Sequence, residues 1–211
     1  MKKQILLSFL FCAGTLLGGK VYAMPMLTLT ASDNHINSFG VVAIDIGVTG
    51  LGNNSAPSLG AFSLDLVYSS NVLRPIFNPV FGTYLGDEGV GEAVTYSDAT
   101  FQSIPAGLEG VYLDEVSFLF DFELDTLQPD SFNLATVFFQ GIADGFGFVG
   151  YENAVLSDAF GGVIAAPVRG GGMLIEVPEP GTLVLFGAAL AGMFLARRRE
   201  QTHFRGLCIE S

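Results

Sequence analysis

Apolar side chains recur at every second residue along most of the region from Met24 to Glu176, and helical periodicity of useful length is missing there. Period two is the pattern of a strand with one buried face, because successive side chains of a strand point to opposite sides. The alternating runs are residues 27–30, 42–49, 62–68, 116–125, 132–142, 147–151, 154–156 and 172–176. We expect their phenylalanines, among them Phe118, Phe120 and Phe122, to fill the core.

Turn signals rich in Gly, Asn, Ser and Pro separate these runs, for example at residues 52–54, 69–71, 86–89, 128–130 and 144–145. About eight or nine strands of modest length, each with one apolar face, fit an antiparallel sandwich of two sheets. The sequence therefore predicts an all-β domain, flanked by an N-terminal signal helix and a C-terminal transmembrane helix.

The charge of the same region restricts its partners. Residues 24–176 hold eighteen Asp and Glu against two bases, Arg74 and Arg169, a net charge of −16 compared with −12 for the whole chain. Phosphate backbones would repel such a body, so nucleic-acid binding is excluded. A solvated acidic surface is one interpretation, and binding of a cation such as calcium is the other.

The N-terminus has the three parts of a secretory signal peptide. Lys2 and Lys3 precede an apolar stretch over residues 5–17, and small residues stand where a signal peptidase reads the chain. We predict cleavage between Ala23 and Met24. The two cysteines, Cys12 and Cys208, both lie outside the predicted body, which therefore has neither a disulfide nor a cysteine-based metal site.

The C-terminal tail begins with a Pro-rich linker that contains Val177, Pro178, Glu179 and Pro180. Residues 182–196 carry no charge and, at about 1.5 Å per residue, would span roughly 22 Å as a helix, less than a full hydrocarbon core. A basic cluster follows, which stops translocation and stays on the cytoplasmic side. It consists of Arg197, Arg198 and Arg199.

The segment VPEPGTLVLFGAALAGMFLARRR resembles the PEP-CTERM sorting signal of Gram-negative bacteria. The resemblance implies recognition and cleavage by an exosortase near Pro178, Glu179 and Pro180, after transient anchoring in the inner membrane. The mature protein would then reach the cell surface or the extracellular matrix. One departure from the pattern is that residues 200–211 extend beyond the arginines, where such tails usually end.

The order of strand-like segments also resembles cohesin-like domains related to carbohydrate-binding modules. The segments that carry this resemblance are residues 39–49, 59–68, 71–73, 132–139 and 153–162. It implies a jelly-roll sandwich of a kind that binds protein modules or polysaccharides. We divide the chain into a signal peptide (1–23), this sandwich (24–172), a linker (173–181), a transmembrane sorting helix with its Arg cluster (182–199) and a cytoplasmic extension (200–211).

Residues that could carry chemistry are few. His35 is the one histidine of the body and lies in a predicted turn, so a solvated loop histidine is the favoured interpretation over a catalytic triad. Acidic residues occur in pairs, such as Asp114 with Glu115 and Asp121 with Glu123, and we expect Asp121, Glu123 and Asp125 to share one outward strand face. Solvated surface is favoured for these pairs over a glycosidase site.

The best ligand candidates surround the acidic, Gly-rich loop. Asp87, Glu88 and Glu92 are the candidate calcium ligands, although they lack the spacing of a known calcium loop. Tyr84 and Tyr96 flank the loop and are the candidate sugar contacts, with partly buried packing as the alternative.

Three functions remain open on this basis. The first is an exported, non-enzymatic envelope or matrix protein that associates with exopolysaccharide or with another surface protein. The second is a secreted polysaccharide hydrolase, and a ligand-free structural spacer is a third alternative. The partners expected from the termini are signal peptidase and exosortase, and no cofactor is expected apart from the calcium considered above.

Overall fold

The computed structural model of the 211-residue chain describes residues 24–76, 78–101, 107–165, 169–178, 181 and 185–193. The predicted signal peptide up to Ala23 lies outside the described residues. Glu179 and Pro180 of the predicted sorting motif lie outside them too, as do the arginines at 197–199 and the extension at 200–211.

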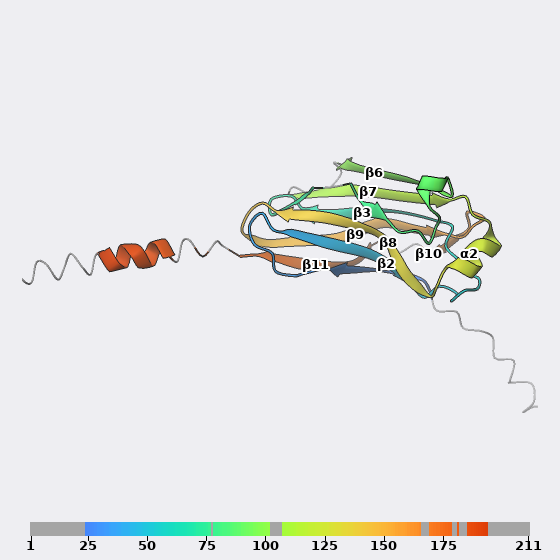
Figure 1. The fold of residues 1–211 in the computed structure, drawn as a ribbon, viewed down its shortest axis with the longest axis horizontal. Helices are drawn as coiled ribbons and strands as arrows, with labels where there is room; N and C mark the ends of the chain where they lie inside the picture. The colour runs from blue at the N-terminus through green and yellow to red at the C-terminus, as the bar shows by residue number, and fades with distance from the viewer. Residues whose placement is uncertain are drawn as a thin grey trace, which may run out of the picture.

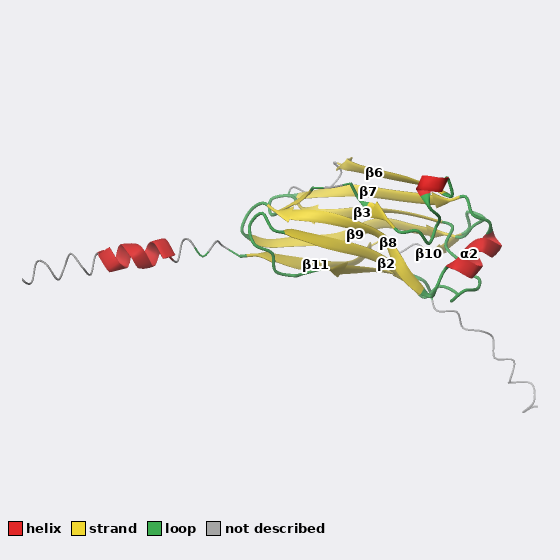
Figure 2. Ribbon diagram, viewed as in Figure 1, coloured by secondary structure: helices red, strands yellow, loops and turns green. Residues whose placement is uncertain are grey.

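Two antiparallel sheets face each other and form a sandwich (Figures 1 and 2). The first sheet runs in the order β1 (Met26–Ala31), β2 (Val41–Thr49), β8 (Ser131–Gly141), β4 (Leu73–Pro75), with β5 (Val80–Phe81) also paired to β8. The second runs β10 (Val163–Ala165), β9 (Gly145–Ser157), β3 (Ala61–Ser69), β7 (Leu108–Ser117), β6 (Ala93–Phe101), with β11 (Arg169–Val177) also paired to β9. The predicted fold class of the body is confirmed.

The core lies between the sheets and is built from the alternating residues of the central strands. Every second side chain of β2 and β3 is buried, and so are those of β8 and β9 that face them. In β2 these are Val42, Ile44, Ile46 and Val48, and in β3 they are Phe62, Leu64, Leu66 and Tyr68. Period two in the sequence therefore identified the inward face of these strands correctly.

The prediction of one strand over residues 116–125 is wrong. Strand β7 ends at Ser117, and α2 (Asp121–Leu127) follows. The neighbouring strands explain the end of β7, because β3 begins at Ala61 and β6 at Ala93, opposite Val116 and Ser117. Beyond Ser117, no described strand pairs with this segment of the chain. The helix α2 instead forms the hydrogen bonds of the segment's backbone groups internally.

The phenylalanines of that run are therefore outside the core. Phe118, Phe120 and Phe122 are each more than 60% exposed, and the rings of Phe120 and Phe122 stack with centroids 5.7 Å apart. The expected outward strand face of Asp121, Glu123 and Asp125 is wrong for the same reason, since all three lie in α2. Glu123 accepts a hydrogen bond from the backbone N–H of Phe120 at the start of this helix.

One buried amide joins the loops at the α2 end of the sandwich. Gln128 is 1% exposed, and its side chain exchanges hydrogen bonds of 2.7 Å with both backbone groups of Leu59. Its Nε2 also donates to the carbonyl of Tyr84 at 3.0 Å. This amide fixes the position of the segment that leads from β5 to the acidic loop.

The sandwich extends further along the chain than we expected. Strand β11 pairs with β9 as far as Val177, and Ile175 and Val177 are buried in the core. Residues 173–177, assigned above to the linker, therefore belong to the sandwich, and the boundary lies after Val177. The alternating run at residues 172–176 had already indicated a strand here, but the domain division placed the boundary next to the three glycines that precede it.

Residues 185–193 are helical, and Figure 1 shows this segment beyond the end of β11. Its side chains are exposed, among them Leu185, Phe186 and Met193. Within the described part of the chain, no helix has both the length and the apolar character that crossing a membrane requires.

Candidate functional site: a cavity between the sheets and a polar face outside them

A cavity of about 510 Å³ opens between the edge strands β5 and β6, which belong to opposite sheets. Phe81 lines it from the first sheet, and Thr95, Ser97 and Glu115 line it from the inward face of the second. Asn78 and Pro79, which precede β5, line it as well. The loop between β5 and β6 closes the cavity with Gly82, Thr83, Gly86, Asp87 and Glu88. Such a volume is typical of a small-molecule pocket.

Glu115 is the unusual residue of this cavity. In β7 it follows Val111 and Leu113 on the inward face, where a third apolar side chain would continue the core. It is 1% exposed, and neither carboxylate oxygen has a hydrogen-bond partner. Burial raises the pKa of Glu115 to about 8, and the nearby charge of Glu88 adds to this shift.

Of the three predicted calcium ligands, two line the cavity and the third stabilises the loop. Asp87 and Glu88 both line the cavity, and Glu88 accepts a hydrogen bond of 2.7 Å from the hydroxyl of Thr95. Glu92 instead accepts a bond from the backbone N–H of Asp87 and so closes the loop around η2 (Glu88–Val90). Among the residues that the structure describes, no group of three or more His, Cys, Asp or Glu is placed to hold a metal ion.

The two candidate tyrosines lie apart from the cavity. The ring of Tyr84 packs on Phe132 at a centroid distance of 4.8 Å, and its side chain is 37% exposed. Tyr96 lies on β6 between the inward-facing Thr95 and Ser97, so its side chain points away from the cavity to the outer face of the second sheet.

The outer face of the second sheet brings Tyr96 together with residues of β7. Tyr96 pairs with Asp114 in register, Val94 with Val116, and the rings of Tyr96 and Tyr112 lie 6.0 Å apart. We call this set the outer polar face. It comprises Val94, Tyr96, Asp98, Tyr112, Asp114 and Val116.

Hydrogen bonds hold the polar groups of this face in place. The hydroxyl of Tyr112 donates to Asp114 at 2.9 Å, and that of Tyr96 donates to Asp98 at 3.4 Å. Partial burial, the bond to Asp114 and the charge of Asp65 together raise the pKa of Tyr112. Val94, Tyr96 and Val116 are nevertheless 48%, 57% and 39% exposed, so apolar and aromatic surface is open to a partner.

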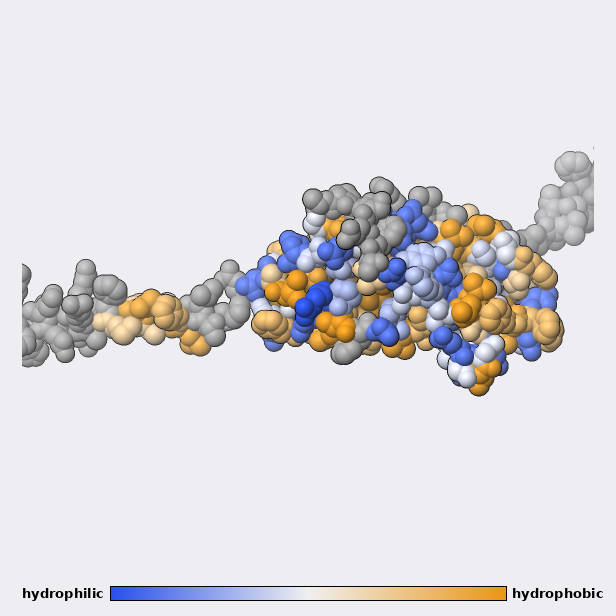
Figure 3. Space-filling view, turned by 90° about the horizontal axis from the view of Figure 1, so that it is seen from above, coloured by the Kyte–Doolittle hydropathy of each residue, from blue (hydrophilic) through white to orange (hydrophobic). Residues whose placement is uncertain are grey.

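Further exposed apolar side chains lie at the α2 end of the sandwich. Figure 3 views the molecule from above and shows hydrophobic residues gathered towards this end, mixed with hydrophilic ones. Phe118, Phe120 and Phe122 are among the exposed residues at this end, and Phe118 directly follows β7. Exposed apolar groups of this size, next to an acidic face, are typical of an interaction surface.

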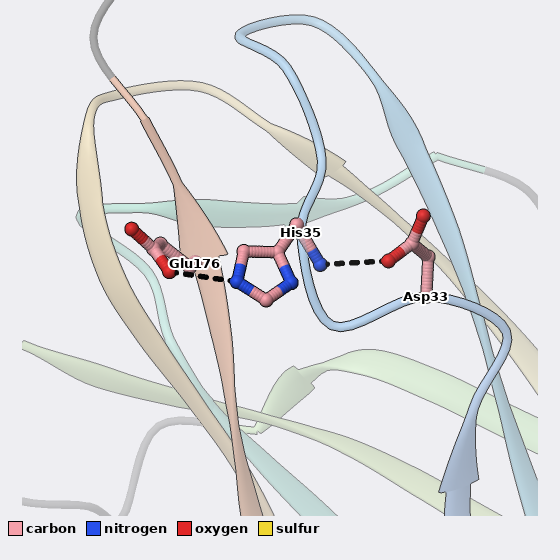
Figure 4. Close-up of polar contacts among 3 residues, drawn as sticks. All are labelled: Asp33, His35 and Glu176. Carbon is pink, nitrogen blue, oxygen red and sulfur yellow. Dashed lines mark hydrogen bonds and ion pairs between the residues drawn. The ribbon is translucent and has the colours of Figure 1, made fainter.

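His35 does not form a triad with its acidic neighbours (Figure 4). Its Nε2 lies 2.9 Å from an oxygen of Glu176, whereas Asp33 accepts a bond from the backbone N–H of His35 rather than from the ring. Both side chains of the His35–Glu176 pair are substantially exposed. The arrangement ties the loop after β1 to β11 and agrees with the solvated histidine that we favoured.

The one missed residue that matters is Glu115. From the sequence we expected a surface acid paired with Asp114, because residues 108–115 did not stand out as a strand. Alternation of Val111, Leu113 and Glu115 with Tyr112, Asp114 and Val116 was the signal that could have placed Glu115 inside.

Comparison with known sequences supports the assignment of the tail. Residues 176–199 match the PEP-CTERM protein-sorting motif. No curated protein matches the sequence of the whole chain.

Comparison with solved structures identifies the fold of the body. A type II cohesin domain from the cellulosome of Acetivibrio cellulolyticus is similar with a TM-score of 0.57 and 14% identity, over 72% of this chain and 95% of that chain. Another type II cohesin module, from an adaptor scaffoldin of the same organism, gives 0.56 and 14%, over 75% and 93%. The cohesin module of a family 33 glycoside hydrolase from Clostridium perfringens gives 0.54 and 9%, over 74% and 98%.

Identities this low show a shared fold and nothing further about activity. The module taken from the glycoside hydrolase is a cohesin module and not a catalytic domain. The chain thus combines a cohesin-like β-sandwich with a PEP-CTERM sorting motif at residues 176–199.

Proposed function

We propose that this chain is a non-enzymatic protein of the cell surface, delivered by its sorting tail, whose sandwich docks a protein partner through the outer polar face. The observation that carries the docking proposal is the cluster of exposed aromatic, aliphatic and acidic groups on β6 and β7. Aromatic side chains dominate the binding energy of protein interfaces, and surrounding charges select the partner.

The partner's contact surface is expected to be basic. Asp98 and Asp114 stand beside Tyr96 and Tyr112, and the body around them has a net charge of −16. Arg or Lys side chains could pair with the carboxylates and stack on the tyrosine rings at once. Cohesin modules in complex with dockerins are among the similar structures, which supports a protein as partner.

A binding comparison tests docking through this face. Wild-type protein and the double variant Tyr96→Ala/Tyr112→Ala would each be immobilised and exposed to surface proteins of the source cells. We expect one protein to be retained by the wild type and to be reduced at least tenfold on the variant. The matched control is Thr28→Ala/Thr30→Ala on the outer face of the first sheet. Equal loss in both variants would contradict docking at the outer polar face.

Export and sorting are tested by the mass of the mature protein. We propose removal of residues 1–23 by signal peptidase and cleavage by exosortase near Pro178, Glu179 and Pro180, after the helix and the arginines have held the chain in the inner membrane. Cells that lack the exosortase should retain the tail, and cells that have it should not. A mature protein from exosortase-positive cells with residues 178–211 intact would contradict this proposal.

The hydrolase alternative has less support. It would need two carboxylates that face one cleft at the separation used by glycosidases. Glu88 and Glu115 line one cavity, but Glu88 is bonded to Thr95, and the similar structures are cohesin modules. We therefore assign binding rather than catalysis to this cavity.

A further inference from the structure

The cavity between β5 and β6 has the composition of a site for a positively charged group. Three carboxylates line it, those of Asp87, Glu88 and Glu115, and no Lys, Arg or His is among the described residues that surround it. Arg74 is bound elsewhere, because its guanidinium donates to Gln140 on β8. The protein itself thus supplies no described counter-ion to this cavity.

Glu115 is the residue of this cavity that most strongly favours a cationic ligand. Buried carboxylates in proteins are paired or hydrogen-bonded in nearly every case, since removal from water is costly. Glu115 has neither kind of partner, although Thr95 and Ser97 are close enough to line the same space. A cation that entered the cavity would meet a carboxylate with all of its hydrogen-bonding capacity unused.

The size and the other lining groups indicate what kind of cation fits. A volume of about 510 Å³ is far larger than a single metal ion with direct ligands needs and is comparable to a small organic molecule. Hydroxyl and amide groups of Thr83, Thr95, Ser97 and Asn78 can bond to hydroxyls, and Phe81 offers an apolar surface.

We propose that this cavity binds an amino sugar, with its protonated primary amine against Glu115 and its ring hydroxyls against the side chains of β6 and the loop that follows β5. The site is separate from the outer polar face, because Glu115 and Asp114 point to opposite sides of β7. Ligand binding in this cavity is therefore independent of protein docking at the outer polar face.

Titration calorimetry with glucosamine as the probe tests the proposal on the purified protein. N-acetylglucosamine is the matched neutral ligand, since it keeps the ring and loses the charge. We expect glucosamine to bind at least tenfold more tightly than the acetylated sugar. Equal affinity for the two sugars, or no binding of either, would overturn the proposal.

The heat of binding provides a second test on the wild-type protein, because it reports proton release. At about pH 6 both the carboxyl of Glu115 and the amine of glucosamine are protonated before binding, and Glu115 is ionised afterwards, so the complex should release close to one proton. The measured heat should then vary with the ionisation enthalpy of the buffer. A heat that is the same in two buffers of different ionisation enthalpy would contradict the assignment of the amine to Glu115.

Two variants test whether glucosamine binding depends on Glu115 itself or on the overall negative charge of the protein. Glu115→Gln should weaken glucosamine at least tenfold and abolish the buffer dependence, while Asp130→Asn, an exposed acid at the α2 end, should leave both unchanged. If Glu115→Gln fails to fold, the acetylated sugar and the buffer dependence still decide. Lysine amide or Ca²⁺ that binds more tightly than glucosamine would overturn the assignment to an amino sugar.

Discussion

Asp114 and Glu115 are adjacent in sequence, yet they lie in opposite environments. Asp114 points to the outer face of β7, where it accepts a hydrogen bond from Tyr112. Glu115 points between the sheets, where it is buried and has no partner. The difference shows that a pair of acids in a strand is never one site, because alternation sends the two side chains to opposite faces.

The same alternation gives the two faces different chemistry. The outer polar face is broad and exposed, and its carboxylates already accept hydrogen bonds from tyrosines. The inward side at Glu115 is narrow and holds an unused carboxylate. A large partner surface suits the first, and a small charged molecule suits the second.

The largest expected effect comes from the apolar inward position next to Glu115. Leu113 is fully buried, and Leu113→Ala should lower the free energy of unfolding by about 4 kcal/mol, through lost burial and the resulting cavity. Urea unfolding of both proteins measures this. A loss below about 1 kcal/mol would mean that the core does not extend to this part of β7.

The pH dependence of stability should report Glu115. Its pKa is raised from 4.5 to about 8 in the folded protein, so between these values the unfolded chain binds fewer protons. Stability attributable to Glu115 should therefore fall as the pH rises from 4.5 to 8, by about 4 kcal/mol. Urea unfolding across this range measures the fall.

Two variants make this prediction specific to the inward face. Glu115→Gln should remove most of the pH-dependent fall, because the amide does not ionise. Asp114→Asn, the adjacent residue on the outer face, should leave the fall in place. A fall that persists in Glu115→Gln would assign the pH dependence to other groups.

The acidic groups of the outer polar face should matter for association and little for stability. Asp98→Asn/Asp114→Asn should weaken docking about five- to tenfold, mainly through slower association, and should reduce its dependence on salt. Surface plasmon resonance at two ionic strengths measures both. Unchanged association rates would show that the partner does not approach these carboxylates.

The smallest effect is expected at the exposed ion pair. His35→Ala should change the free energy of unfolding by less than about 0.5 kcal/mol, because both His35 and Glu176 are open to water. Thermal unfolding of the variant measures it. A loss above about 2 kcal/mol would show that the loop after β1 depends on this contact.

Much of the sandwich could be predicted from the local alternation of apolar residues. The rest depends on pairing between strands that are distant in sequence. The central strands could be predicted because every second residue from Val42 to Val48 and from Phe62 to Tyr68 is apolar without exception. The run from Val116 to Leu124 alternates as strictly, yet it becomes a strand end and a helix, since its neighbours in space begin opposite Val116. Pairing, which the sequence pattern does not contain, decided the outcome.

Among the candidate site residues, some could likewise be predicted from a local motif, and one depends on the arrangement of the strands. Asp87 and Glu88 could be proposed because a Gly-rich acidic loop is visible in the sequence, and the structure places both at the cavity. Glu115 could not be assigned to it without knowing that β7 spans Leu108–Ser117 and faces β5 across the sandwich. The sorting tail was the clearest sequence signal, because its function lies in a contiguous motif.

Site-specific photo-crosslinking in the source cells can show whether a partner protein docks on the outer polar face. A photoreactive phenylalanine analogue would replace Tyr96 in one protein and Met26, on the outer face of the first sheet, in another, two positions that are 57% and 59% exposed. If the partner docks there, we expect a crosslink to one protein from position 96 and none from position 26. The same crosslinks from both positions, or a crosslink from position 26 alone, would contradict it.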